Sequence, residues 1–301
     1  MRWDELAPPD LRLLLFGGKG GVGKTTCAAA AALALAGRRP AARILLLSTD
    51  PAHSLGDVLE VPLGDDERAV PGAPGALQAR ELDASRAFSR WRDRHGATVG
   101  GALATFAADG AGVEDLLDLT PPGLDELVAV ATLLDAVVGA GAATYDLVVV
   151  DTAPTGHALR LLEMPRLALD WDHALLSVLL KYREAVRLGD LAAELVELSK
   201  SLKRLEALLR DPARARFVAV TRAAELPRRE TVRLLSSLAD LSIAVPAVIV
   251  NAAGPPDEAP KGLRRTGPGR CAIIKAPAEL PPPRGVGELG RWVRTWKETE
   301  Q

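Results

Sequence analysis

The stretch GKGGVGKT, residues 18–25, matches the phosphate-loop pattern G-x-x-x-x-G-K-[ST]. The apolar run LRLLLF at 11–16 precedes it, and a helical pattern begins at Lys24. Glycines let the backbone N–H groups of such a loop converge on phosphate oxygens, and the helix N-terminus adds partial positive charge. The sequence therefore predicts a strand–loop–helix unit that binds a nucleotide.

Further apolar runs predict a parallel β-sheet that is covered on both faces. They are continuous rather than alternating, which is typical of strands with two buried faces. The expected strands are 11–16, 43–48, 145–151, 216–221, 245–251 and 271–275. Helical patterns lie at 24–36, 85–108, 124–138, within 165–210, at 228–238 and at 286–297. This alternation predicts an α/β fold with a doubly wound, mostly parallel sheet.

The nucleotide motif occurs once, so we expect residues 1–301 to form a single domain. Two turn-rich stretches, 62–76 and 251–269, are expected to be exposed loops rather than linkers, because strand signals resume after each. The segments 84–118 and 165–210 are expected to form an inserted helical subdomain.

Composition limits the classes of partner and the location. The 37 basic and 39 acidic residues give a net charge of −2, which argues against a general nucleic-acid surface. Cys27 and Cys271 form no C-x-x-C pair, so we expect neither zinc nor a disulfide framework. There is no signal-peptide pattern and no apolar run of about 20 residues, the length that spans a bilayer. We therefore expect a cytoplasmic protein.

The phosphate loop supplies most of the expected nucleotide contacts. Lys24 is expected to bridge the β- and γ-phosphates, and the Thr25 hydroxyl is expected to ligate Mg²⁺. The nucleotide-binding residues expected here are Gly18, Lys19, Gly20, Gly21, Val22, Gly23, Lys24, Thr25 and Thr26.

Lys19 is a second lysine in this loop, and the next lysine after Lys24 is Lys181. A cation at the mouth of the loop can stabilise charge that develops during phosphoryl transfer. It could act within its own subunit or reach the nucleotide of a partner subunit. The alternative is an ordinary solvated lysine.

Asp50 lies in STDPAHSLGDVL, residues 48–59, directly after the second expected strand. A carboxylate at the carboxyl end of a strand can orient the attacking water and accept its proton, so we predict a catalytic role. The alternative is that Asp50 only caps a short helix within 52–59. Pro51 and His53 belong to the same expected switch segment.

Asp151 ends the apolar run YDLVVVD, residues 145–151. This layout predicts a carboxylate that holds Mg²⁺ through water. TAPTGH then follows beside the γ-phosphate position, and a loop whose order depends on that phosphate acts as a switch. The expected switch residues are Thr152, Pro154, Thr155, Gly156 and His157.

These segments together closely resemble the ArsA-type ATPases, a family that includes the arsenite-pump ATPase and the ATPase that targets tail-anchored membrane proteins. GKGGVGKT resembles the deviant Walker A loop of the wider MinD/ParA/nitrogenase-iron-protein class. The resemblance covers residues 11–296. Its segments are FGGKGGVGKTT, STDPAHSL, PPGLDE, YDLVVVDTAPTGHALRLLEMP, VTRAAELPRRETVRLLSSL, VIVNAAG and KAPAEL.

The resemblance implies a P-loop ATPase that binds ATP and Mg²⁺ and works as a nucleotide-sandwich homodimer. Lys19 then contacts the nucleotide of the opposing subunit, while Lys24 serves its own. Asp50 activates water, and Thr25 and Asp151 belong to the Mg²⁺ shell. Asn251 matches the adenine-reading asparagine, and Pro277 matches the segment that flanks adenine. The cycle of opening and closing implies a protein client or a membrane-associated partner.

The sequence departs from the family where clients are handled. It lacks the C-x-x-C zinc clasp of the tail-anchor branch, and two cysteines cannot form the cysteine triad of the arsenite branch. A client groove could have Leu175, Leu176, Leu179 and Leu180 as its floor and a helix within 79–96, around Phe88 and Trp91, as a wall. The alternative is that these helices only pack on their own domain.

The C-terminal stretch 287–301 places Leu289, Trp292, Val293 and Trp296 on one helical face. This face could dock on the domain or, as in the MinD branch, bind a membrane. Three functions therefore remain open: a client-handling ATPase, a MinD/ParA-like positioning switch, and a nucleotide-binding regulator with little turnover. A nitrogenase-type reductase is disfavoured, because its cluster needs cysteines that this chain lacks.

Overall fold

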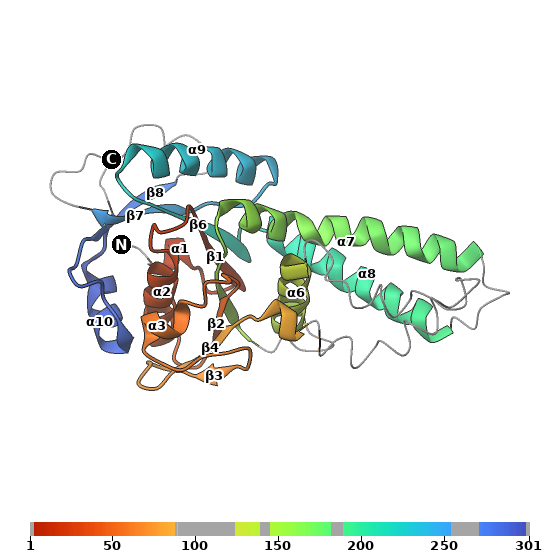
Figure 1. Ribbon diagram of the computed structural model, residues 1–301, viewed down its shortest axis with the longest axis horizontal. Coiled ribbons are helices and arrows are strands. Elements are labelled where there is room, and N and C mark those ends of the chain that lie inside the picture. The colour runs from red at the N-terminus through yellow and green to blue at the C-terminus, as the bar shows by residue number, and fades with distance from the viewer. Residues whose placement is uncertain are drawn as a thin grey trace.

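One sheet forms the centre of the molecule, with the strand order β3–β4–β2–β5–β1–β6–β7–β8–β9 (Figure 1). The computed structural model describes residues 3–87, 89, 124–138, 145–181, 189–253 and 271–298. The strands are β1 (Leu13–Gly17), β2 (Arg43–Ser48), β3 (Arg68–Ala69), β4 (Ala76–Glu81), β5 (Leu147–Asp151), β6 (Ala215–Thr221), β7 (Ala247–Ala253), β8 (Ala272–Pro277) and β9 (Lys297–Glu298). Neighbouring strands are parallel, except for the antiparallel edge pairs β3–β4 and β8–β9.

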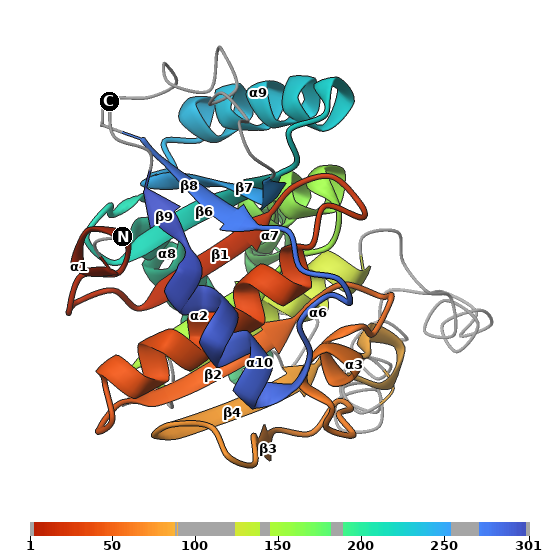
Figure 2. The same ribbon diagram turned by 90° about the vertical axis from the view of Figure 1, so that its left-hand side faces the viewer.

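Helices cover both faces of this sheet. They are α1 (Trp3–Leu6), α2 (Lys24–Arg38), α3 (Leu55–Leu59), α6 (Leu124–Leu133), the π-helical turn η1 (Leu134–Val138), α7 (Thr155–Lys181), α8 (Gly189–Arg210), α9 (Glu225–Asp240), α10 (Gly285–Trp292) and the 3-10 turn η2 (Val293–Thr295). In Figure 2, α2 and α10 lie in front of the sheet and α8 lies behind it. Helices α7 and α8 pack together and extend away from the sheet (Figure 1).

Two apolar cores fill the space between the sheet and these helices. One core contains side chains of α2, α3 and α10, and the other contains side chains of α6, α7, α8 and α9. Strand β1 contributes side chains to both cores, because Leu14 and Phe16 belong to the first core and Leu13 and Leu15 belong to the second. All residues of β1 and β5 are buried, as expected for central strands with helices on both sides. The predicted doubly wound α/β fold is confirmed.

All six expected strands are present, with boundaries shifted by no more than two residues. Strand β4 was not expected, because it alternates buried and half-exposed residues and lacks an apolar run. It pairs with β2 along its whole length. The interpretation of 79–96 as a helical wall is therefore wrong for residues 79–81, which end β4, while residues 84–87 and 89 are helical as expected. Short β3 lies inside the stretch 62–76, which was expected to be a loop.

Helix α7 begins earlier than expected, at Thr155. Thr155, Gly156 and His157 form its first turn, so the expected switch loop is partly helical. Pro165 resembles a helix start in the sequence but lies inside α7. A proline inside a helix removes one N–H donor and crowds the carbonyl four residues earlier. Helix α7 nevertheless continues through Pro165, and it packs on α6 and α8.

Part of the expected client groove lies outside the described residues. This applies to Phe88 and Trp91 and to residues 90–118. Leu175, Leu176, Leu179 and Leu180 belong to α7, but their side chains also lie outside the described part. The division into one domain with an inserted helical subdomain stays a prediction.

The C-terminal helix docks on its own domain. Leu289, Trp292, Val293 and Trp296 are all buried. The ring of Trp296 stacks on Trp3 with a centroid distance of 6.4 Å. Membrane insertion would need this apolar face to be exposed, so the docking interpretation is confirmed. Among the described helices, none has the length and apolarity that crossing a membrane requires.

Candidate functional site

The phosphate loop joins the buried end of β1 to the start of α2, and two of its positions require glycine. Gly18 has a φ of 156°, and a Cβ there would lie 2.2 Å from the Val220 carbonyl oxygen. Gly23 has a φ of 90°, and a Cβ there would lie 2.2 Å from the side-chain nitrogen of Asn251. At Gly18 the obstacle is the backbone of β6, and at Gly23 the positive φ itself favours glycine, so glycine at both positions lets the loop take this path.

Lys24 and Asp50 face each other at the mouth of this loop. Lys24 is 5% exposed, and its Nζ lies 3.7 Å from Asp50 Oδ2. Asp50 Oδ1 accepts a hydrogen bond from the Ala52 N–H. The side chain of Asp50 is 13% exposed, so it can reach water. The structure thus brings together the two residues that the sequence predicts for phosphate binding and water activation.

Asp151 ends β5 and is fully buried beside these residues. Its Oδ2 accepts a hydrogen bond of 3.1 Å from the Ser48 hydroxyl, while Oδ1 has no hydrogen-bond partner of good geometry among the described residues. Burial raises the pKa of Asp151 to about 7, although the Thr25 hydroxyl and the Lys24 charge oppose this shift. A buried carboxyl group with a free oxygen is suited to a cation or to the water bound to one.

The donor set fits Mg²⁺ better than a metal that needs a protein cage. No cluster of three or more His, Cys, Asp or Glu able to hold a metal occurs among the described residues. Mg²⁺ instead takes one or two protein oxygens together with phosphates and water. Thr25 Oγ1 lies 3.2 Å from the Ser54 Oγ, next to Asp151. Ser54 lies four residues after Asp50, directly before α3, and the sequence does not mark its hydroxyl as part of the site.

The segment 152–157, which the sequence predicts to be the second switch, is tied to β1 and to α6. Thr152 donates both its N–H and its hydroxyl to the Phe16 carbonyl. The Thr155 hydroxyl is buried and has no hydrogen-bond partner in the part of the chain that the structure describes. His157 Nδ1 lies 2.8 Å from Oε1 of the buried Glu126, which lies on α6. Motion of this segment can therefore reach the helical layer through His157 and Glu126.

The two segments that the sequence predicts to be switches lie close together. They line a cavity of about 30 Å³ together with α6. The lining residues are Thr49, Pro51, Asp125, Glu126, Ala129, Ala153, His157 and Leu161. The segments after β2 and β5 therefore meet in space, as the sequence predicts for parallel strands that lie side by side. Pro154 and Gly156 lie in the second segment, next to these residues.

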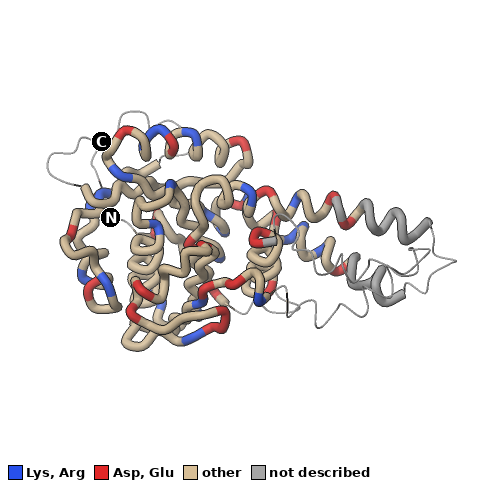
Figure 3. Tube along the Cα trace, viewed as in Figure 1, with Lys and Arg blue, Asp and Glu red and all other residues tan. Residues whose placement is uncertain are grey.

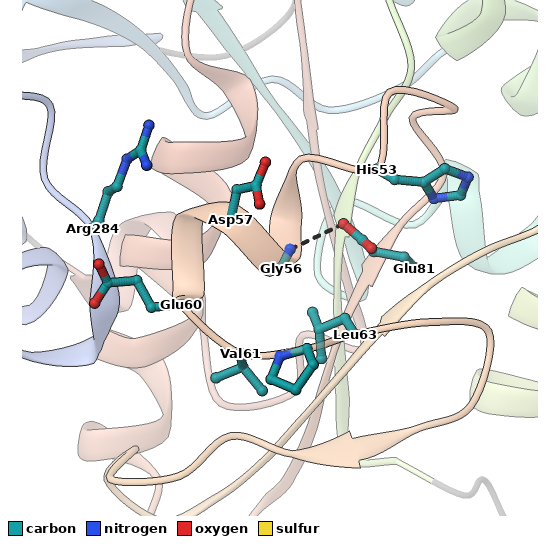
Figure 4. A pocket seen from close by; sticks show the side chains of 9 residues that line it. His53, Gly56, Asp57, Glu60, Val61, Leu63, Glu81 and Arg284 are labelled. Atoms are coloured by element: carbon teal, nitrogen blue, oxygen red, sulfur yellow. Dashed lines mark hydrogen bonds between the residues drawn. The ribbon is translucent and has the colours of Figure 1, made fainter.

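Strand β4 fixes the helix that follows Asp50. Glu81 Oε1 accepts hydrogen bonds from the N–H groups of Leu55 and Gly56, at 2.7 and 3.0 Å. Figure 4 shows this carboxylate beside a pocket of about 450 Å³, which His53 and Arg284 also line. Glu81 caps the first turn of α3, and the sequence does not predict this role because β4 lacks the apolar run that marks the central strands.

The expected adenine-binding residues lie on the other side of the loop. The Asn251 amide donates to the Val22 carbonyl at 2.8 Å, and its oxygen accepts from the Ala252 N–H. The Pro277 carbonyl accepts a hydrogen bond of 2.9 Å from Trp292. Asn251 therefore braces the phosphate loop, and its role in reading adenine stays a prediction.

Lys19 has a partner on a different element from Lys24. Its Nζ lies 2.9 Å from Oε1 of Glu230 on α9. Both side chains are about one-third exposed, at 31% and 33%. The loop thus carries one buried lysine facing Asp50 and one partly exposed lysine facing α9. Glu230 was not identified from the sequence, because the contact joins residues far apart in the chain.

Comparison with known proteins agrees with this geometry. A family model described as anion-transporting ATPase, of the ArsA type, matches residues 11–263. The ATPase ASNA1 homolog of Entamoeba dispar is 30% identical over 258 residues, which are 80% of this chain and 76% of that protein. The ATPase GET3 of Kluyveromyces lactis is 34% identical over 262 residues, 80% of this chain and 71% of that protein. The ATPase GET3 of Pyricularia oryzae is 32% identical over 258 residues, which are 80% of this chain and 73% of that protein. The chain therefore belongs to the ArsA-type family of anion-transporting ATPases, and it is an ATPase.

Proposed function

We propose that this ATPase works with Mg²⁺ as a nucleotide-sandwich homodimer, and that hydrolysis opens and closes a surface for a protein client. The observation that carries the proposal is the buried Lys24, which faces Asp50 beside the free oxygen of Asp151. A buried ammonium ion and a free carboxylate oxygen, next to exposed glycine backbone, match the groups that a triphosphate and its metal require.

The residues divide the reaction among them. Lys24 and the loop N–H groups hold the phosphates, and Thr25 with Asp151 would hold the metal. Asp50 orients the attacking water and takes up its proton. When bound, Mg²⁺ neutralises charge on the phosphate oxygens. Lys19 is proposed to supply the same kind of stabilisation to the nucleotide of the facing subunit.

The helical layer is the proposed client surface. Among the large apolar side chains that are exposed, Leu127, Leu167, Val196 and Leu198 lie on α6, α7 and α8. The pair His157–Glu126 joins this layer to the nucleotide site. We propose a client with an apolar segment, or a membrane-associated protein partner. Burial of the C-terminal tryptophans removes the main support for a MinD-like membrane switch.

Asp50→Asn tests the catalytic part of this proposal. The variant should bind ATP with unchanged affinity but lose at least about tenfold in the rate of Mg²⁺-dependent hydrolysis, because the amide cannot accept a proton from water. Asp57→Asn, which alters an exposed carboxylate on α3, is the matched control and should keep the rate. An unchanged rate in Asp50→Asn would contradict the assignment of Asp50.

The same variant tests the client part. Asp50→Asn loaded with ATP should retain a closed dimer, and proteins that co-elute with it can be compared by mass spectrometry with those from the nucleotide-free protein. We expect proteins with an apolar segment to be enriched in only one of the two states. Equal sets of proteins in both states would contradict nucleotide-controlled binding.

A further inference from the structure

We propose that Glu230 is a positioning residue for Lys19. It holds Lys19 against its own subunit before nucleotide binds, and it releases Lys19 when two ATP-loaded copies of the chain meet. The release step rests on the proposed function, because the acceptor of Lys19 is the nucleotide of a second copy. The holding step rests only on the contact between the two side chains.

The ion pair between Lys19 and Glu230 is strong enough to hold Lys19 in place, and it is exposed enough to be broken by a competing anion. Lys19 Nζ and Glu230 Oε1 are 2.9 Å apart, which is a direct charge-assisted hydrogen bond. Both side chains remain about one-third exposed, so water and a competing anion can reach them. An ion pair of this kind biases a side chain by a factor of up to about five, which a phosphate group can overcome.

The loop around Lys19 leaves room for the lysine to move. Gly20 and Gly21 follow it and both are exposed, and a Cβ added to either would meet no described residue within 4 Å. Lys24, in contrast, is buried against Asp50. The two lysines therefore have carboxylate partners on different elements, and Lys19 can leave Glu230 without disturbing the partner of Lys24.

Helix α9 also carries a cation that can pair with Glu230 after Lys19 has moved away. Charged residues of both signs lie along this helix (Figure 3). Arg233 is exposed and lies three residues after Glu230, a spacing that places side chains side by side on a helix. A nearby cation lowers the penalty of leaving Glu230 without Lys19, so the release stays reversible.

Chemical labelling of the nucleotide-free protein tests the holding step. An amine-acetylating reagent and peptide mass spectrometry give the labelling rate of Lys19, with exposed Lys203 and Lys297 as internal standards. Glu230→Gln should raise the rate at Lys19 about two- to fivefold, because loss of the ion pair frees the amine. Glu225→Gln, which removes the Glu225–Arg229 pair on the same helix, should not. Unchanged labelling in Glu230→Gln overturns the inference and leaves the proposed function intact.

Turnover tests the release step. At protein concentrations where turnover per chain still rises with concentration, Glu230→Gln should turn over ATP about two- to fivefold faster than the wild type. The gain should vanish when Lys19→Ala is added to Glu230→Gln. A fall in turnover would show that Glu230 is a fixed brace, which overturns the release step. Unchanged turnover in that concentration range would likewise overturn the release step. If mixing Lys19→Ala chains with Lys24→Ala chains restored no turnover, the second copy would be excluded as acceptor, and the labelling result would then show that only the proposed dimer had failed.

Discussion

Asp151 combines complete burial with a free carboxylate oxygen, and this has a consequence for stability. Burial raises its pKa from 3.8 to about 7 in the metal-free protein. The folded state therefore holds a proton that the unfolded state has lost between about pH 4 and pH 7. The free energy of unfolding should fall as the pH rises through this window, because the charged form is buried.

Asp151→Asn should remove this penalty. In EDTA and without nucleotide, the variant should be more stable than the wild type above pH 7, by at most about 4 kcal/mol, since one pKa unit corresponds to about 1.4 kcal/mol. At pH 4 the two proteins should be nearly equal. Urea unfolding at several pH values measures this, with Asp57→Asn as the exposed control. If the difference in the free energy of unfolding between wild type and variant were the same at pH 8 as at pH 4, the raised pKa of Asp151 would be contradicted.

At this scale the sequence predicts residues that belong to continuous motifs. Lys24, Asp50 and Asp151 converge as expected, because parallel neighbouring strands place their carboxyl ends at one edge of the sheet. Glu126 and Glu230 could not be predicted from the chain, since their partners lie on other elements and no local pattern marks such contacts. The pairing of Lys19 with Glu230 joins residues 211 positions apart.

At the scale of elements, apolar composition explains which strands could be predicted. Central strands such as β1 and β5 have two buried faces and appear as uninterrupted apolar runs. Strand β4 has only part of its surface buried and includes Gln78 and Arg80, so its sequence resembles that of a helix or loop. The sequence does not predict the early start of α7, because Pro154 and Gly156 are residues typical of turns.

The missed strand β4 leads to a prediction about α3. Glu81→Ala would leave the buried N–H of Leu55 and the half-buried N–H of Gly56 without their acceptor, at a loss of about 1–3 kcal/mol in the free energy of unfolding. Turnover should also fall, because α3 follows the segment that carries Asp50. Glu81→Gln keeps an oxygen acceptor on a side chain of the same size, so it should retain most of the stability and most of the turnover. Urea unfolding and ATPase assays compare the three proteins, and equal losses in both variants would contradict a capping role.

At the scale of the whole molecule, the remaining question is whether Lys19 completes the site of a second copy. Lys24 is buried in its own subunit and faces Asp50, whereas Lys19 is partly exposed and faces α9. The roles of the two lysines can therefore be tested by substituting each one alone. Lys19→Ala chains keep Lys24, and Lys24→Ala chains keep Lys19. If Lys19 acts across the interface, a mixed dimer has one complete site, in the Lys19→Ala subunit.

Mixing these two inactive variants should therefore restore turnover. Random pairing of equal amounts makes half of the dimers mixed, and each mixed dimer has one complete site out of two, so the mixture should reach about one quarter of wild-type turnover. A control mixture of Lys24→Ala with the double variant Lys19→Ala/Lys24→Ala should stay inactive, because no pairing completes a site. A lysine that acts only within its own chain gives no recovery in either mixture, since every chain lacks one of the two lysines. Recovery should also decline on dilution, because dissociated subunits cannot share Lys19.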